Sequence, residues 1–135
     1  MKNILFLCTG NSCRSQMAEG FARQQAPVGT AVYSAGIEKH GLDPRAVRVM
    51  AEIGVDISNQ WSKTVNGIPA ECIDTVITLC GQAAETCPAF LVNLPGAHWS
   101  LPDPARAEGT EMEVLAVFRR VRDEIQRRVA ELFAC

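Results

Sequence analysis

Short apolar runs and amphipathic stretches alternate along the first part of the chain. The runs at 3–7 and 30–36 each end at a loop or a glycine, which is typical of buried parallel strands. Between them, apolar residues at helical spacing predict a helix that begins at Ser15, its expected cap, and stops before a proline. A second helix is predicted over 43–54, where a proline stands near the start and a glycine at the end.

The rest of the chain continues this alternation and ends in a long helix. The run at 74–80 predicts a third buried strand, a weaker fourth strand lies within 90–99, and a short helix is expected over 69–73. The segment 111–133 is amphipathic, with apolar side chains at Val114, Phe118, Val121, Ile125, Val129 and Leu132. Alternating strands and helices predict the α/β class, in which ligands bind at the carboxyl ends of parallel strands.

Composition and charge narrow the class of protein. The 135 residues suit a single domain, 1–135, and the hydrophobic fraction of 47% and charged fraction of 21% are those of an ordinary globular protein. A net charge of −2 argues against nucleic acid as a partner, because no basic field would attract a phosphate backbone. No apolar stretch has the length of a membrane helix, and the N-terminal run lacks the flanks of a signal segment. We expect a monomeric cytoplasmic protein whose six cysteines are mostly reduced.

The loop between the first strand and the first helix, CTGNSCR, has the chemistry of an anion site. Successive backbone N–H groups at a helix N-terminus can surround a tetrahedral oxyanion, Gly10 gives freedom to curl, and the Arg14 guanidinium matches two oxyanion oxygens. The same positive field favours the thiolate form of Cys8, a nucleophile to which the Ser15 hydroxyl can donate. The expected substrate-binding residues are Thr9, Gly10, Asn11, Ser12, Cys13 and Arg14.

Other interpretations of the loop are weaker. Zinc sites favour two to four residues between paired ligands, so the four between Cys8 and Cys13 fit only loosely. Only His40 and His98 would add nitrogen ligands, and no metal site is expected. A purely structural turn would need neither the arginine nor a cysteine at the end of the strand. Cys13, which faces the helix and the core, is expected to be a buried and inert thiol.

Beyond the loop, residue patterns alone leave the chemistry open. Asp103 stands between two prolines, where a stiff loop would aim its carboxylate as a general acid, although Asp-Pro is also a common turn pair. Cys80 ends a predicted strand at the same edge of the sheet as Cys8, and Cys87 follows in the string CGQAAETC. From the pattern alone, Cys80 and Cys87 are best interpreted as structural thiols.

The motif of Cys8, five intervening residues, Arg14 and Ser15 resembles the signature of low-molecular-weight protein tyrosine phosphatases. The strings CTGNSCRSQMAEG, YSAGIE, DISNQ, VITLC, HWSLPDPA and RVRDEI are similar to those of the arsenate reductases built on that phosphatase fold. The resemblance extends from position 3 nearly to the C-terminus. It implies a three-layer sandwich, in which helices cover both faces of a four-stranded parallel sheet, and an enzyme without a bound cofactor.

The resemblance also implies roles for individual residues. Cys8 would attack arsenate or a similar tetrahedral oxyanion, Asp103 would protonate the departing oxygen, and Cys80 and Cys87 would form a disulfide relay that thioredoxin regenerates. The alternative is a phosphatase acting on phosphotyrosine, which shares Cys8, Arg14 and Asp103 but leaves the second pair of cysteines unexplained. A non-enzymatic alternative is a sensor of redox state or arsenic that uses the same thiols as a switch.

One part of the sequence departs from the family pattern. Some family members bind potassium through residues that correspond to Asn11, Glu19 and Ser34, but the two remaining ligand positions here are Trp61 and Lys63. Neither side chain offers an oxygen ligand. Our hypothesis is that the Lys63 ammonium takes the place of the cation against Glu19, and the alternative is a solvated lysine.

Four further residues have no place in this chemistry. Cys72 precedes the third predicted strand and is expected in the core, whereas Cys135, at the terminus, is expected to be exposed. Arg106 and His98 lie close to Asp103 in the sequence, and neither is assigned a role.

Overall fold

The computed structural model describes residues 2–79 and 94–134 of the chain. Within these ranges, four strands form one sheet in the order β2-β1-β3-β4, and every neighbouring pair is parallel. The strands are β1 (Lys2–Cys8), β2 (Thr30–Gly36), β3 (Thr75–Thr78) and β4 (Gly96–His98). The predicted α/β class and its four-stranded parallel sheet are confirmed.

β1 lies inside the sheet, and this position explains its unbroken apolar sequence. It pairs with β2 along its whole length, up to Cys8 opposite Gly36, and with β3 along its other edge. Residues 4–7 are between 0% and 3% exposed, because neighbouring layers cover both faces of the strand. The strand ends at Cys8, so the first candidate catalytic residue stands at the carboxyl edge of the sheet.

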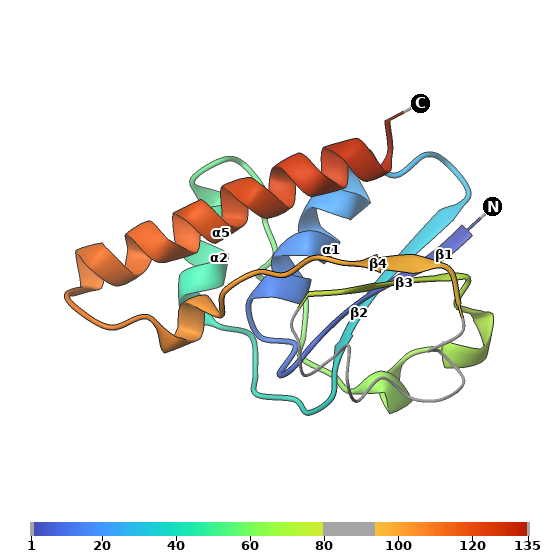
Figure 1. Ribbon diagram of the computed structural model, residues 1–135, viewed down its shortest axis with the longest axis horizontal. Coiled ribbons are helices and arrows are strands. Elements are labelled where there is room, and N and C mark those ends of the chain that lie inside the picture. The colour runs from blue at the N-terminus through green and yellow to red at the C-terminus, as the bar shows by residue number, and fades with distance from the viewer. Residues whose placement is uncertain (1, 80–93, 135) are drawn as a thin grey trace.

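Three α-helices of the described part of the chain lie together on one side of the sheet (Figure 1). They are α1 (Arg14–Gln25), α2 (Pro44–Ala51) and α5 (Glu111–Leu132). The short 3-10 helices η1 (Val65–Gly67) and η2 (Ala70–Cys72) lie on the other side, and η3 (Pro104–Arg106) precedes α5. The sheet is therefore the middle layer of the predicted sandwich.

The long helix α5 is joined to α2 through polar as well as apolar contacts. It begins with a capping box, in which the Glu113 backbone N–H donates to Thr110 Oγ1 and the Thr110 backbone N–H donates to Glu113 Oε1. Its predicted apolar face packs against the core. Arg122 is buried beside α2, where it donates to the Val49 carbonyl at 2.9 Å and to Glu52 at 3.0 Å. These bonds fix the end of α2 against α5.

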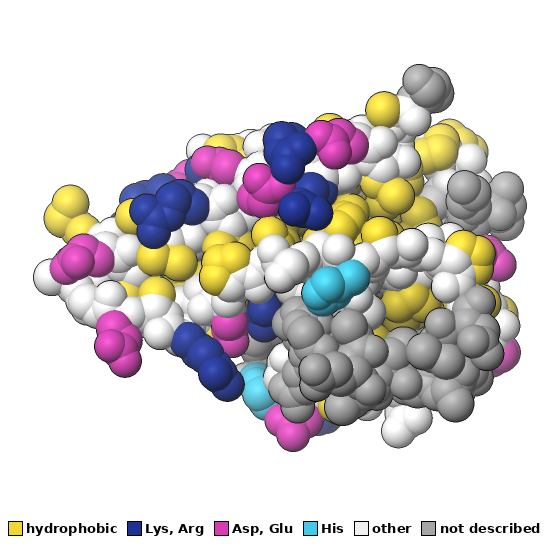
Figure 2. Space-filling view, viewed as in Figure 1, with side chains coloured by type: hydrophobic (Ala, Val, Ile, Leu, Met, Phe, Trp, Pro, Cys, Tyr) yellow, Lys and Arg dark blue, Asp and Glu magenta, His cyan; other side chains and the backbone are white. Residues whose placement is uncertain are grey.

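Charged side chains of both signs are interspersed over α5 on the face shown in Figure 2. Arg127 pairs with Glu124 and Glu131, and Arg128 also pairs with Glu124. Exposed ion pairs of this kind add little stability. Their mixture of positive and negative charges keeps this surface of α5 from carrying a large patch of one charge sign. Among the described residues, no helix has the length and apolarity that crossing a membrane requires.

The ends of two helices differ from the prediction. Ser15 is not the cap of α1, because the helix begins one residue earlier, its N-cap is Cys13, and no side chain bonds there. α2 is shorter than predicted and stops at Ala51. The chain then turns through Gly54, whose φ of 81° ends the helical path. In both cases the prediction found the helix and misplaced its boundary.

The cysteines outside the loop also need a correction. Cys72 is exposed, so the prediction that it lies in the core is wrong. The reason is that η2 runs at the surface, where the Cys72 carbonyl accepts a hydrogen bond from Asn3 Nδ2 at 2.9 Å. Cys80, Cys87 and Cys135 lie outside the described residues.

Candidate active site

The loop 8–12 turns its carbonyl groups away from its own centre. A second segment, 37–43, runs beside it and donates backbone hydrogen bonds to four of these carbonyls. The bonds are Ile37 N to Cys8 O at 3.1 Å, Glu38 N to Thr9 O at 2.9 Å, His40 N to Gly10 O at 2.9 Å, and Asp43 N to Ser12 O at 3.1 Å. The fifth carbonyl, of Asn11, accepts from the Gln16 side chain at 3.1 Å. Because the N–H of a trans peptide points opposite to its C=O, the N–H groups that follow these carbonyls point inward.

The inward N–H groups form a cradle at the N-terminus of α1. The first turn of this helix contains no acidic residue, and no side chain caps it. The partial positive charge of the helix end therefore adds to the cradle, and no acidic side chain of the first turn neutralises it. This is the arrangement that the sequence predicts for binding a tetrahedral oxyanion.

Two residues allow the loop to take this shape. Asn11 has a φ of 49°, in the left-handed region that residues other than glycine rarely adopt. Gly10 is not in that region, so the prediction that it supplies the conformational freedom is wrong. Its role is steric, because a Cβ at this position would lie 2.3 Å from His40 Nδ1. The missing side chain of Gly10 makes room for the His40 ring.

The candidate nucleophile, Cys8, lies at the base of the cradle and is 2% exposed. Its Sγ is 2.8 Å from Ser15 Oγ, which stands on the first turn of α1. Ser15 Oγ also accepts a hydrogen bond from Asn11 Nδ2 at 2.8 Å. Its own hydrogen is then free to point at the sulfur, where a hydrogen bond stabilises the thiolate.

Arg14 joins the cradle to two other parts of the chain. The guanidinium is buried, and Nη1 donates to the Leu101 carbonyl at 3.1 Å and to the Leu79 carbonyl at 3.5 Å. Nη2 lies 3.6 Å from Asp103 Oδ2. Arg14 therefore holds both the loop that carries the candidate acid and the end of the β3 segment.

Asp103 stands at the mouth of the site, with its side chain 30% exposed. Oδ1 accepts from Ala105 N at 3.0 Å and so caps η3, while Oδ2 faces Arg14 and, at 3.9 Å, Arg106 Nε. The capping bond aims the carboxylate in the way that the flanking prolines predict. Its partial exposure leaves it open to exchange protons with solvent.

A pocket of about 570 Å³ opens between the loop and Asp103. Its walls are formed by residues of the loop and by four residues from elsewhere, namely Cys8, Thr9, Gly10, Ser12, Cys13 and Arg14 with His40, Asp103, Ala105 and Arg106. The structure thus places five of the six expected substrate-binding residues on the pocket wall. Asn11 is the exception, because its side chain is fully buried behind the loop.

Cys13 differs chemically from Cys8. It is 3% exposed, and burial together with the neighbouring Asp43 carboxylate raises the pKa of the Cys13 thiol far above its usual range. Its Sγ lies 3.5 Å from Asp43 Oδ2. A thiol held neutral in this way is a poor nucleophile, in agreement with the predicted inert role.

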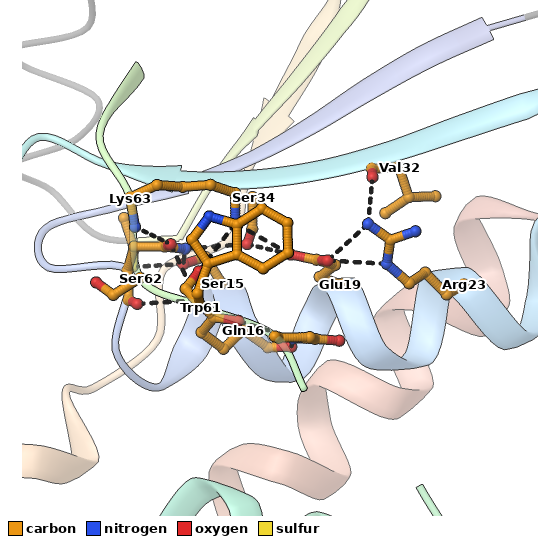
Figure 3. A network of polar contacts seen from close by, with 12 residues as sticks. Ser15, Gln16, Glu19, Arg23, Val32, Ser34, Trp61, Ser62 and Lys63 are labelled. Carbon is orange, nitrogen blue, oxygen red and sulfur yellow. Dashed lines mark hydrogen bonds and ion pairs between the residues drawn. The ribbon is translucent and has the colours of Figure 1, made fainter. Parts of the chain in front are cut away.

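Behind the loop, buried polar side chains form a network that includes Ser15, Ser34 and Glu19 (Figure 3), and Ser15 connects this network to Cys8. Asn11 Nδ2 donates to Ser15 Oγ and, at 3.0 Å, to Ser34 Oγ. Ser34 Oγ donates to Glu19 Oε1 at 2.5 Å, and Lys63 Nζ lies 3.7 Å from the same oxygen. The structure therefore brings together Asn11, Glu19, Ser34 and Lys63, four of the five residues that the sequence analysis grouped around a cation position.

Sequence reasoning missed three residues that support the loop, Gln16, Gln60 and Ser62. Gln16 Nε2 donates to Asn11 Oδ1 at 2.9 Å, and Gln60 Nε2 donates to Gln16 Oε1 at 2.7 Å. Ser62 Oγ donates to the Gly10 carbonyl at 3.0 Å. Gln16 lies in a run of α1 that is buried throughout, and this burial is visible only in the structure.

The histidines have partners other than a metal. His98 Nδ1 is 2.7 Å from Thr78 Oγ1, and His40 Nε2 is 2.8 Å from Glu38 Oε2. Within residues 2–79 and 94–134, no group of three or more His, Cys, Asp and Glu side chains has the arrangement of a metal site.

The predicted relay cysteines, Cys80 and Cys87, lie outside the described residues, but Leu79 is placed. Its backbone N–H donates to the Leu7 carbonyl at 2.9 Å. Its carbonyl is the one that accepts from Arg14 Nη1. The main chain immediately before Cys80 therefore contacts both the strand that carries Cys8 and the guanidinium of the cradle.

The whole chain was compared with known protein families. A sequence profile of the family described as low molecular weight phosphotyrosine protein phosphatase matches residues 3–135. The chain belongs to this family. Among relatives of the family, the arsenate reductase of Halalkalibacterium halodurans is 56% identical over 128 residues, or 95% of this chain and 92% of that protein. The arsenate reductase of Bacillus subtilis is 55% identical over 130 residues, or 96% of this chain and 94% of that protein.

Solved structures of other proteins have the same fold as this chain over almost the whole length of the chain. An arsenate reductase in the phosphate binding state matches with a TM-score of 0.84 and 39% identity, covering 98% of this chain and 97% of the other. A thioredoxin-dependent arsenate reductase of Corynebacterium glutamicum matches with a TM-score of 0.75 and 27% identity, covering 98% of this chain and 60% of the other. The sheet order and the anion loop described above are thus set in a phosphatase-like fold.

Proposed function

We propose that this protein is an arsenate reductase that uses a relay of Cys8, Cys80 and Cys87 and is regenerated by thioredoxin. The observation that carries the proposal is the position of Leu79, which contacts the strand of Cys8 and the guanidinium of Arg14 immediately before the second cysteine. The reaction is supported by arsenate reductases among the relatives. The electron source is supported by the thioredoxin-dependent enzyme with a similar fold.

The first step uses the cradle and the pocket. Arsenate, a tetrahedral oxyanion, binds with its oxygens toward the inward N–H groups and the fork of Arg14. The thiolate of Cys8, which receives a hydrogen bond from Ser15, attacks arsenic and forms a sulfur–arsenic bond. Asp103, at the mouth of the pocket, protonates the departing hydroxyl, which leaves as water.

The second step transfers the electrons. The thiolate of Cys80 attacks the Cys8 sulfur, a disulfide forms, and the sulfur–arsenic bond breaks. Its electron pair stays with arsenic, which is released as arsenite. Arsenic gains two electrons, and two thiols lose them.

The last steps restore the enzyme. Cys87 attacks Cys80, the Cys8 thiolate leaves, and the new Cys80–Cys87 disulfide is reduced by thioredoxin. The electrons therefore come from a protein partner, and no bound cofactor is needed. We place this cycle in a monomer in the cytoplasm, where thioredoxin is kept reduced.

Arsenate-dependent oxidation of NADPH in the presence of thioredoxin and thioredoxin reductase tests the reaction. We expect turnover by the native chain and none by Cys80→Ser or Cys87→Ser. Cys72→Ser is the matched control, because it removes an exposed thiol away from the cradle and should keep full activity. Mass spectrometry of Cys87→Ala after exposure to arsenate should detect a trapped Cys8–Cys80 disulfide. If this disulfide does not form in the variant, the proposed relay is wrong.

A phosphatase is the second candidate, because the cradle, the nucleophile and the acid suit a phosphate ester equally well. The family description favours it. Hydrolysis of p-nitrophenyl phosphate, measured beside arsenate reduction, separates the two. We expect only weak hydrolysis as a side activity. Efficient hydrolysis that survives in Cys80→Ser, together with no arsenate reduction by the native chain, would assign the protein to the phosphatases instead.

A further inference from the structure

A buried ion pair lies behind the loop, and the reaction steps above do not use it. The Glu19 side chain is 3% exposed and that of Lys63 10%, with Nζ 3.7 Å from Oε1. A second cation, Arg23, bonds the other carboxylate oxygen with its Nε at 2.8 Å, but its side chain is 54% exposed. Lys63 is therefore the enclosed cation of the pair. A buried carboxylate needs such a partner, because desolvation alone favours its neutral form.

The ammonium of Lys63 is held by the kinds of group that surround a bound alkali cation. Nζ donates to the Trp61 carbonyl at 3.0 Å and lies 4.8 Å from the centre of the Trp61 ring. The aliphatic stem packs beside Gly67, where an added Cβ would come within 3.3 Å of the Lys63 Cβ. Burial lowers the pKa of the Lys63 amine, and the Glu19 charge opposes this effect. The Glu19 carboxylate therefore favours the charged form of the Lys63 amine.

The charge on Glu19 sets the direction of hydrogen bonding from the ion pair to Ser15 (Figure 3), and from Ser15 to the nucleophile. An ionised carboxylate only accepts, so Ser34 donates to Glu19 and accepts from Asn11 Nδ2. The second hydrogen of Asn11 Nδ2 goes to Ser15 Oγ. Ser15 then directs its own hydrogen to Cys8 Sγ. A neutral Glu19 would have a hydrogen to donate, and this order would no longer be fixed.

The backbone of Lys63 contributes separately from its side chain. Its N–H donates to Asn11 Oδ1 at 2.9 Å, and Gln16 Nε2 donates to the same oxygen. Because both groups donate, the atom that they contact must be the amide oxygen of Asn11. The amide nitrogen, Nδ2, therefore faces Ser15 and Ser34. A substitution at Lys63 keeps the backbone bond, so the effect of the ammonium can be measured alone.

We propose that Lys63 is a positioning residue whose ammonium acts as a tethered monovalent cation, holding Glu19 charged and so keeping a hydrogen-bond donor on Cys8. The native chain then needs no added potassium to maintain a reactive thiolate. Removal of the side chain leaves a space beside a carboxylate and a backbone carbonyl, which are ligands that hard cations prefer. The inference rests on the proposed function only in taking Cys8 as the nucleophile.

Lys63→Ala tests the proposal through two measurements that need no arsenate. The first is the rate at which iodoacetamide alkylates Cys8, followed by mass spectrometry of its peptide over a range of pH. The second is the melting temperature. We expect alkylation of the variant at pH 7 to slow about tenfold, because a hydrogen bond to a charged group is lost. Addition of potassium or methylammonium chloride to about 0.2 M, against tetramethylammonium chloride of equal ionic strength, should restore the rate and raise the melting temperature.

Two further variants complete the test. Arg120→Ala removes an exposed cation of α5 and should behave as the native chain, whose alkylation and melting should not respond to potassium. Lys63→Met keeps a side chain of similar length without the charge, so it should be slow and should not be restored.

A Lys63→Ala chain that is alkylated at the native rate, or whose defect no cation restores, would overturn the proposal. The proposal would also be overturned if potassium changed the alkylation rate and melting temperature of the native chain as strongly as those of the variant. A native chain that does not reduce arsenate would refute the proposed function, and the alkylation and melting results would still decide the role of Lys63.

Discussion

At the scale of single residues, the contact between Ser15 and Cys8 decides how reactive the nucleophile is. Ser15→Ala removes the hydroxyl that lies 2.8 Å from Cys8 Sγ. A hydrogen bond to a charged group is worth about 1.5–3 kcal/mol, so the thiolate population at pH 7 should fall and alkylation of Cys8 by iodoacetamide should slow at least tenfold. Ser58→Ala, at an exposed turn, is the control and should be alkylated at the native rate. An unchanged rate in Ser15→Ala would contradict the assignment of the donor.

Gly10 and His40 provide a second prediction at the same scale. Gly10→Ala places a Cβ 2.3 Å from His40 Nδ1, so the ring or the loop must move. We expect the free energy of unfolding to fall by about 1–3 kcal/mol, as for other overpacked sites, and phosphate binding to weaken. The same substitution in a His40→Ala background should cost clearly less, and urea unfolding of the four chains measures this coupling. Equal costs in both backgrounds would mean that the contact does not shape the loop.

At the scale of the elements, the contact between α2 and α5 predicts how stability changes with pH. Hydrogen bonds from Arg119, with further contributions from Arg122, lower the pKa of Glu52 from 4.5 to about 2. A carboxylate with a lowered pKa in the folded state stabilises the fold above its unfolded pKa and loses this contribution as the pH falls through its folded pKa. Glu52→Gln should therefore melt below the native chain at pH 7, and the difference should narrow between pH 4.5 and the lowest pH at which the fold survives. Glu108→Gln, an exposed control, should show no such narrowing in thermal melts followed by circular dichroism.

Elements whose pattern is dictated by burial were predictable, whereas those shaped by the site were not. β1 and α5 were predictable from their apolar residues. A strand buried on both faces has a continuous apolar run, and a helix buried along one face has apolar residues at helical spacing. Ser15 has the residue type of a helix cap, but its hydroxyl bonds Cys8 and the helix end is left open for an anion. The chemistry of the loop was likewise predictable from Cys8 and Arg14. Gln60 was not, because its contact with the loop joins positions far apart in the chain.

At the scale of the whole molecule, the anion site is a product of the complete fold. The loop 8–12 is held by the neighbouring segment 37–43, by the Ser62 side chain and the Lys63 backbone, and through Arg14 by the stretch at 101–103. None of these segments forms a cradle by itself. An anion that binds only when they are assembled therefore stabilises the folded state as a unit.

Phosphate, which resembles arsenate in shape and charge, should raise the melting temperature of the native chain. At a phosphate concentration of one hundred times the dissociation constant the gain is about 2.7 kcal/mol. For a domain of this size the gain corresponds to a rise of about 10 °C. Arg14→Lys keeps the positive charge but loses the two-pronged donor, so its rise at the same phosphate concentration should be much smaller. Sodium chloride of equal ionic strength separates binding from general salt effects, and an equal response of the two chains to phosphate would show that the guanidinium does not hold the anion.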